Sequence, residues 1–152
     1  MNTQTRTAAG KFENNSLMAA IVIIRQGVTE ARQNLGKSGE DLAALELECR
    51  GYAIIERRYR TDHGEIDIIA RDGETLVFVE VRRRSSSEFG TAAESVTPGK
   101  QRRVIRMAVA YLAMHGLYDR CPVRFDVVAI DDRPDGTPQV TVYAGAFDDT
   151  RR

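Results

Sequence analysis

Residues 64–84 of this chain, GEIDIIARDGETLVFVEVRRR, constrain its fold more than any other stretch. Two runs that alternate apolar and polar residues flank the turn-forming pair Asp72-Gly73, which is the pattern of a β-hairpin. Because side chains alternate along a strand, one face of this hairpin is apolar and the other is charged. The predicted apolar face consists of Ile66, Ile68, Val77, Val79 and Val81. The predicted charged face consists of Glu65, Asp67, Glu80 and Arg82, together with Phe78.

The charged face brings carboxylates close together. With the predicted turn, Glu65 is expected opposite Glu80, and Asp67 opposite Phe78. Asp67 and Glu80 then become diagonal neighbours, with Cα atoms roughly 7–8 Å apart. Two carboxylates about 6 Å apart repel each other by roughly 2–3 kcal/mol at an effective dielectric constant of about 20. A Mg²⁺ or Mn²⁺ ion would remove this repulsion, since both accept carboxylate ligands; the alternative is a polar sheet face whose carboxylates pair with neighbouring arginines.

The length and composition fit a single domain. The chain has 152 residues, 42% of them hydrophobic and 29% charged, which is ordinary for a globular protein with one core. Residues 1–34 are expected to form an N-terminal extension, partly disordered or carrying an appended helix, and residues 35–152 the domain. The two cysteines form no metal-binding or disulfide pattern, and no apolar stretch reaches the ~20 residues of a membrane span. We therefore expect a cytoplasmic protein with no membrane partner.

Capping residues and apolar patterns place the other elements. Ser38 is expected to cap a helix over residues 39–50, and Thr97 a helix over residues 98–115. The resulting order, α-β-β-β-α-β-β, predicts an α/β fold in which helices pack on a mixed sheet. Strands are expected over residues 52–60, 65–70, 75–82, 123–131 and 139–147.

The segment from residue 82 to residue 106 is strongly basic within a chain of net charge zero. It holds seven basic and two acidic residues. A concentrated positive surface is typical of a protein that binds a polyanion, and the alternative is a solvated surface without a partner. The basic residues are Arg82, Arg83, Arg84, Lys100, Arg102, Arg103 and Arg106.

Asp67, twelve intervening residues and then Glu80-Val81-Arg82 resemble the D…ExK motif of restriction-endonuclease-like (PD-(D/E)xK) nucleases. Further stretches resemble, in the same order, the bacterial YraN-type endonuclease-like family: GEDLA, GY, GEIDIIARDG, LVFVEVRRRSS, AAESVTPGKQRR and RFDVVAI. The resemblance covers residues 35–147. It implies a restriction-endonuclease-like mixed sheet flanked by helices, with the motif on its central hairpin.

The resemblance also implies roles for individual residues. Asp67 and Glu80 would ligate Mg²⁺ or Mn²⁺. Glu40 matches the helix acid that joins the metal site in Holliday-junction-resolvase-like nucleases; the alternative is an acid that stabilises its helix by ~0.3–1 kcal/mol through the helix dipole. Gln101 lies where related nucleases keep polar site residues, and simple exposure is the alternative. The nucleic-acid-binding residues expected together with Gln101 are Arg83, Arg84, Arg102 and Arg106.

Arg82 departs from the motif, which has Lys at this position. Arg stays charged and is unsuited to activating a water, but it can bind a phosphate through two hydrogen bonds and stabilise developing negative charge. Either a metal ion activates the water without help, or Lys100 of the following helix supplies the missing amine. The expected catalytic residues are Asp67, Glu80, Arg82 and Lys100.

Three functions are compatible with these features. The first is a Mg²⁺- or Mn²⁺-dependent endonuclease that cleaves phosphodiester bonds of DNA, including branched or flapped DNA. The second is a protein of the same fold that binds nucleic acid without cleaving it, because Arg82 replaces the motif Lys. The third is a partner-binding scaffold whose acids and bases neutralise one another. We expect the first function, the endonuclease, with nucleic acid as the partner. The sequence does not decide between a monomer and a homodimer.

Overall fold

In the computed structural model, residues 38–85 and 96–148 are described. They form helices and strands in the predicted order, and residues 1–34, the predicted extension, lie outside them. No helix in these two described ranges is long and apolar enough to cross a membrane. The elements are α2 (Gly39–Cys49), β1 (Ala53–Thr61), β2 (Gly64–Asp72), β3 (Thr75–Ser85), α3 (Pro98–Met114), β4 (Val123–Asp132) and β5 (Pro138–Phe147).

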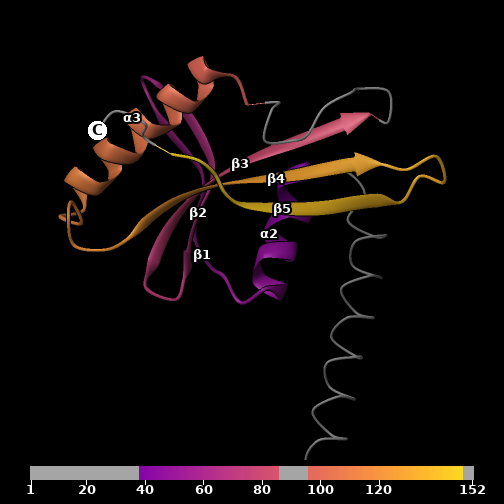
Figure 1. Cartoon of the computed structure of the whole chain (residues 1–152), viewed down its shortest axis with the longest axis horizontal. Coiled ribbons are helices and arrows are strands. Elements are labelled where there is room, and N and C mark those ends of the chain that lie inside the picture. The colour runs from indigo at the N-terminus through magenta and orange to yellow at the C-terminus, as the bar shows by residue number, and fades with distance from the viewer. Residues whose placement is uncertain (1–37, 86–95, 149–152) are drawn as a thin grey trace, which may run out of the picture. The chain divides into compact units, whose positions relative to one another are not determined.

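The strands form one mixed sheet in the order β1-β2-β3-β4-β5. Every neighbouring pair is antiparallel except β3 and β4, which are parallel. Parallel neighbours need a long crossover connection, and α3 lies in the connection between them (Figure 1). The chain therefore has the predicted α/β fold, and the arrangement agrees with a restriction-endonuclease-like sheet.

Each helix covers one apolar layer of the sheet. Tyr111 of α3 packs edge-on against Tyr59 and Phe78, with ring centroids 5.1 and 5.7 Å apart. The α3 layer consists of Tyr59, Ile66, Ile69, Leu76, Phe78, Val104, Met107, Ala108, Tyr111, Leu112 and Phe125. The α2 layer consists of Ala43, Ala44, Leu47, Tyr52, Ile68, Ala70, Val77, Val79 and Val128.

The turn of the β2–β3 hairpin lies one residue later than predicted. Asp72 pairs with Thr75, so Gly73 and Glu74 are the central turn residues. Gly73 has φ +59, a conformation that glycine adopts without strain. Asp72 stays in the strand because its carboxylate accepts a hydrogen bond from Arg124 of β4 (2.9 Å). A contact between distant parts of the sequence therefore selects the turn.

This shift changes which residues face each other. Ile69, and not Asp67, faces Phe78, so that prediction is wrong. The register ends at Ile68, and continuing it by one residue brings Asp67 opposite Glu80. Asp67 and Glu80 therefore follow directly after the last pair of the register, and the Asp67 side chain contacts β3 through the backbone N–H of Val81.

The β1–β2 hairpin continues past this point toward α3. Gly64 lies against the side chains of Arg103 and Met107 of α3. Ile66 is predicted to share a face with Ile68. It packs in the α3 layer instead, because this end of the hairpin lies against α3. In β1, Arg58 adopts φ +55, which costs a residue other than glycine roughly 1–2 kcal/mol. This irregularity interrupts the alternation of side chains along β1.

The first turn of α2 lies close to the sheet. Gly39 approaches β4 so closely that a Cβ would lie 3.2 Å from the side chain of Ile130, and a larger residue would push the helix away. Ser38 occupies the N-cap position, but its side chain forms no capping hydrogen bond, contrary to the prediction. Asp41, three residues after Ser38, accepts a hydrogen bond from Arg57 of β1. This close start brings Glu40 over the strands.

Candidate functional site

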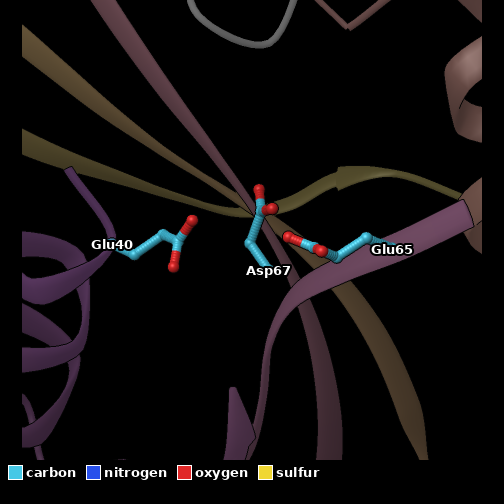
Figure 2. Close-up of side chains that lie close together, drawn as sticks. All are labelled: Glu40, Glu65 and Asp67. Carbon is cyan, nitrogen blue, oxygen red and sulfur yellow. The ribbon is translucent and has the colours of Figure 1, made fainter. Parts of the chain in front are cut away.

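Three carboxylates converge where β2 leaves β3 (Figure 2). Asp67 and Glu65 extend from β2, and Glu40 extends toward them from the first turn of α2. One carboxylate oxygen of each lies within 4.8 Å of those of the other two. Glu40 thus approaches Asp67, as the resemblance implies. Glu65 belongs to this acidic cluster as well, whereas the direct ligands that the resemblance implies are Glu40, Asp67 and Glu80.

Asp67 lies at the centre of the acidic cluster. Its carboxylate accepts a hydrogen bond from the backbone N–H of Val81 (2.7 Å), which ties the side chain to β3. Burial raises the pKa of Asp67, and the neighbouring Glu40 and Glu65 raise it further, while Val81 N–H and Lys100 lower it. A carboxyl group in such surroundings is stabilised as an anion by a nearby cation.

Glu80 is almost fully buried, with 1% of its surface exposed. It forms an ion pair with Lys100 of α3, and Arg82 Nε lies 3.4 Å from its Oε1. The Thr97 side chain caps α3 as predicted by accepting a hydrogen bond from the Lys100 N–H (3.4 Å), which fixes this residue in the first turn. Burial raises the pKa of Glu80, with Asp67 as the next cause, and the two cations oppose the shift.

The four residues predicted as catalytic therefore lie near one another, although their roles stay predictions. The connection between β3 and β4 contains α3, and it brings Lys100 into an ion pair with Glu80, two residues before Arg82. Glu80, which is predicted as a metal ligand, is not part of the acidic cluster, and its carboxylate forms an ion pair with Lys100.

Arginines of β1 pair with two members of the acidic cluster. Arg58 Nε donates to Glu40 (2.5 Å), and Arg60 forms an ion pair with Glu65. The hydrogen bond to Glu40 is the main cause that raises the pKa of Arg58. Sequence reasoning missed both arginines. The signal was the basic string ERRYR, but the positive φ of Arg58 is not readable from it.

The predicted basic surface is divided between two faces of the sheet. Arg82 and Arg83 are consecutive in β3, so their side chains point in opposite directions. Arg82 lies by Glu80, whereas Arg83 donates two hydrogen bonds to Asp132, each 2.9 Å long. These bonds raise the pKa of Arg83 and lower the pKa of Asp132.

The other predicted nucleic-acid-binding residues have different surroundings. Gln101 donates to the carbonyl of Val96 (2.9 Å) and so stabilises the start of α3. Arg102 and Arg106 are exposed, and neither forms an ion pair within the described ranges. Arg84 belongs to β3, but its side chain lies outside the described part of the chain.

The donor atoms of the site fit a small divalent cation with a phosphate beside it. The acidic cluster offers only carboxylate oxygens, which Mg²⁺ and Mn²⁺ prefer over nitrogen or sulfur. Arg82 Nε is buried and has no hydrogen-bond partner among the described residues. A buried donor of this kind is usually satisfied, so a phosphate oxygen is a fitting partner for it.

A second polar cluster, the Arg124 network, lies within the same sheet. Asp126 is 0% exposed and accepts hydrogen bonds from Tyr52 Oη (3.2 Å), Gly145 N (2.9 Å) and Arg124 Nε (2.8 Å). Arg124 also donates to Asp72. We did not identify this network from the sequence, although two charged residues beside the apolar run of β4 were its signal. Its donors and acceptors satisfy one another, which is typical of a structural cluster.

Comparison with known proteins gives one consistent result. The model of the uncharacterised protein family UPF0102 matches residues 39–130, a range that contains the acidic cluster as well as Glu80, Arg82 and Lys100. A UPF0102 protein of Geotalea uraniireducens is 47% identical over 116 residues, which cover 76% of this chain and 91% of the relative. A UPF0102 protein of Moorella thermoacetica is 49% identical over 121 residues, covering 79% of this chain and 100% of the relative. The chain belongs to the uncharacterised protein family UPF0102.

Proposed function

We propose that this protein is a Mg²⁺- or Mn²⁺-dependent endonuclease of the restriction-endonuclease-like (PD-(D/E)xK) superfamily that hydrolyses phosphodiester bonds of DNA, including branched or flapped DNA. The observation that carries the proposal is the acidic cluster: oxygens of Glu40, Glu65 and Asp67 lie within 4.8 Å of one another. Glu80 of the neighbouring strand holds two cations, Lys100 and Arg82. Carboxylates with cations next to them are the groups that phosphoryl transfer needs.

Glu40, Glu65 and Asp67 would hold the metal ion. When bound, the ion supplies Lewis-acid polarisation of a phosphoryl oxygen and favours deprotonation of a water. Asp67 is the member that gains most from a cation, because it is partly buried and forms no ion pair within the described residues. In this arrangement Glu80 is a positioning residue that holds Lys100, and not a ligand.

Arg82 and Lys100 act on the substrate. Arg82 Nε–H, which lies 3.4 Å from Glu80 Oε1 without a hydrogen bond to it, donates to a nonbridging phosphate oxygen and stabilises the negative charge that develops there. Lys100 supplies the amine that the motif normally has two residues after Glu80. Lys100, held in its ion pair with Glu80, donates to a phosphate oxygen or to the leaving oxygen.

The proposal is tested by incubating the protein with labelled duplex, flap and four-way-junction DNA in Mn²⁺, in Mg²⁺ and in EDTA. Cleavage is expected with either ion and not in EDTA, and Asp67→Asn is expected to abolish it. Asp62→Asn, at an exposed acid of the β1–β2 turn, is the matched control and should cleave normally. Equal cleavage by wild type and Asp67→Asn would reveal a contaminating nuclease and overturn the proposal.

Binding without cleavage is the second candidate function. Arg82 in place of the motif Lys favours it, since Arg stays charged and is unsuited to activating a water. A wild-type protein that binds these substrates with a steep salt dependence, but cleaves none of them with Mn²⁺, would decide for this alternative.

A further inference from the structure

Two of the three acids in the acidic cluster already carry a cation from the protein itself. Arg58 binds Glu40, and Arg60 binds Glu65. Both arginine side chains are largely exposed, 54% and 71%, whereas Glu40 and Glu65 are 20% and 31% exposed. Asp67, at the centre, receives no arginine among the described residues. The arginines thus cover the outer acids from the solvent side.

A metal ion and a guanidinium compete for the same carboxylate oxygens. Exposed ion pairs are weak, because solvent screens them and the side chains lose freedom in forming them. Displacing Arg58 and Arg60 is therefore inexpensive for an ion that Asp67 also holds. A displaced guanidinium keeps its charge and its fork of donors, which matches a phosphate in shape and charge.

We propose that Arg58 and Arg60 exchange partners during binding: they pair with Glu40 and Glu65 in the metal-free protein and bind backbone phosphates of the nucleic acid once a divalent cation occupies the carboxylates. This inference rests on the proposed function, and it assigns to β1 a phosphate-binding role. The positions suit it, because Arg58 and Arg60 lie next to the site yet project from it into solvent.

The exchange couples the two ligands. In the metal-free protein, nucleic acid has to compete with Glu40 and Glu65 for the arginines. In the metal-bound protein, both arginines are released to the phosphates. Metal therefore raises the affinity for nucleic acid, and nucleic acid raises the affinity for metal by the same factor.

The test measures two affinities in single variants that remove one arginine charge each. Mn²⁺ binding without nucleic acid is measured by calorimetry, and binding of a fluorescein-labelled DNA duplex is measured by anisotropy in Ca²⁺. Arg58→Gln and Arg60→Gln are each expected to bind Mn²⁺ about two- to fivefold more tightly, because the internal competitor is gone. Each is expected to bind DNA up to about fivefold more weakly, with a salt slope smaller by about 0.9.

Arg57→Gln is the matched control. Arg57 is the neighbouring arginine of β1 and pairs with Asp41 (2.5 Å), which lies outside the acidic cluster. The variant loses the same charge but leaves the ion pairs of the acidic cluster in place. Its affinity for Mn²⁺ should therefore stay at the wild-type value. Thermal unfolding of all three variants checks that the fold is intact, which the exposure of the three side chains favours.

The outcomes separate this inference from the proposed function. Wild type that binds Mn²⁺ through Asp67, with no gain in Arg58→Gln and Arg60→Gln over Arg57→Gln, overturns only the exchange. Tighter Mn²⁺ binding without weaker DNA binding overturns the phosphate-binding role. Absence of Mn²⁺ binding in wild type and in every variant overturns the proposed function and the exchange together.

Discussion

The acidic cluster and the Arg124 network both bury carboxylates in the same sheet, but they neutralise them differently. Asp126 accepts four hydrogen bonds, and two of them come from Arg124. Among residues 38–85 and 96–148, Asp67 accepts one, from a backbone N–H, and its other near neighbours include two acids. Burial raises the pKa of Asp67. The comparison teaches that the Arg124 network stabilises the fold, whereas the acidic cluster is left incomplete in a way that a bound cation would correct.

The largest expected effect is a loss of stability when the Arg124 network is broken. Arg124→Met leaves the fully buried Asp126 without its cation and should lower the free energy of unfolding by about 3–5 kcal/mol. Urea denaturation measures it. Arg50→Met removes an exposed pair with Glu46 on α2 and should change stability by no more than about 0.5 kcal/mol. Similar values for the two variants would show that the Arg124 network is not structural.

The next effect concerns the cations beside Glu80. Arg82→Ala should lower the cleavage rate by about 10²–10³, the usual loss when one charge-stabilising donor is removed. Lys100→Ala should be as damaging if Lys100 supplies the amine, and adding Arg82→Lys should then rescue it, because Lys returns to the motif position. Single-turnover cleavage with Mn²⁺ measures these rates. Cleavage by Lys100→Ala at the wild-type rate would show that Lys100 does not take part in the reaction.

A smaller effect is expected at Asp67, where a substitution should weaken Mn²⁺ binding without lowering the stability of the fold. Asp67→Asn should weaken Mn²⁺ binding at least about tenfold, since a charged ligand is lost. Without metal, its free energy of unfolding should equal or exceed that of wild type, because burial disfavours the charged form. Calorimetry and urea denaturation provide the two numbers. A large loss of stability would instead make Asp67 a structural residue like Asp126.

The smallest effects are expected on the basic surface. Arg102→Gln and Arg106→Gln should each weaken DNA binding a few-fold and reduce the salt slope by about 0.9, because each removes one exposed charge. Arg83→Gln should change both less, because Asp132 already holds Arg83. Fluorescence anisotropy over a salt series compares them. Equal losses in all three variants would mean that Asp132 releases Arg83 to the phosphates.

Local patterns were sufficient to predict the elements but not the register. Alternation located β2 and β3, and Thr97 caps α3 as its sequence indicated. The turn was misplaced by one residue because Asp72 is held by Arg124, a partner on another strand. Such a contact exists only after the sheet has formed.

The candidate site shows the same limit. Side-chain parity predicted one face for Glu65, Asp67 and Glu80. Parity does not hold along β2, however, because Ile66 packs in the α3 layer and Ile68 in the α2 layer. The pairing of Lys100 with Glu80 depends on where the crossover sets α3, and the sequence could only name Lys100 as a candidate. The arginines on Glu40 and Glu65 depend on the positive φ of Arg58, for which a run of arginines gives no signal.

The central claim is that the acidic cluster binds a divalent cation, and an anomalous-difference map from a crystal soaked in Mn²⁺ tests it most directly. We expect one peak roughly 2.1 Å from oxygens of Asp67 and of Glu40 or Glu65. Arg58 should have left Glu40, and Lys100 should still contact Glu80. A map without a peak at Asp67, in which Arg58 and Arg60 keep their carboxylates, would contradict the account.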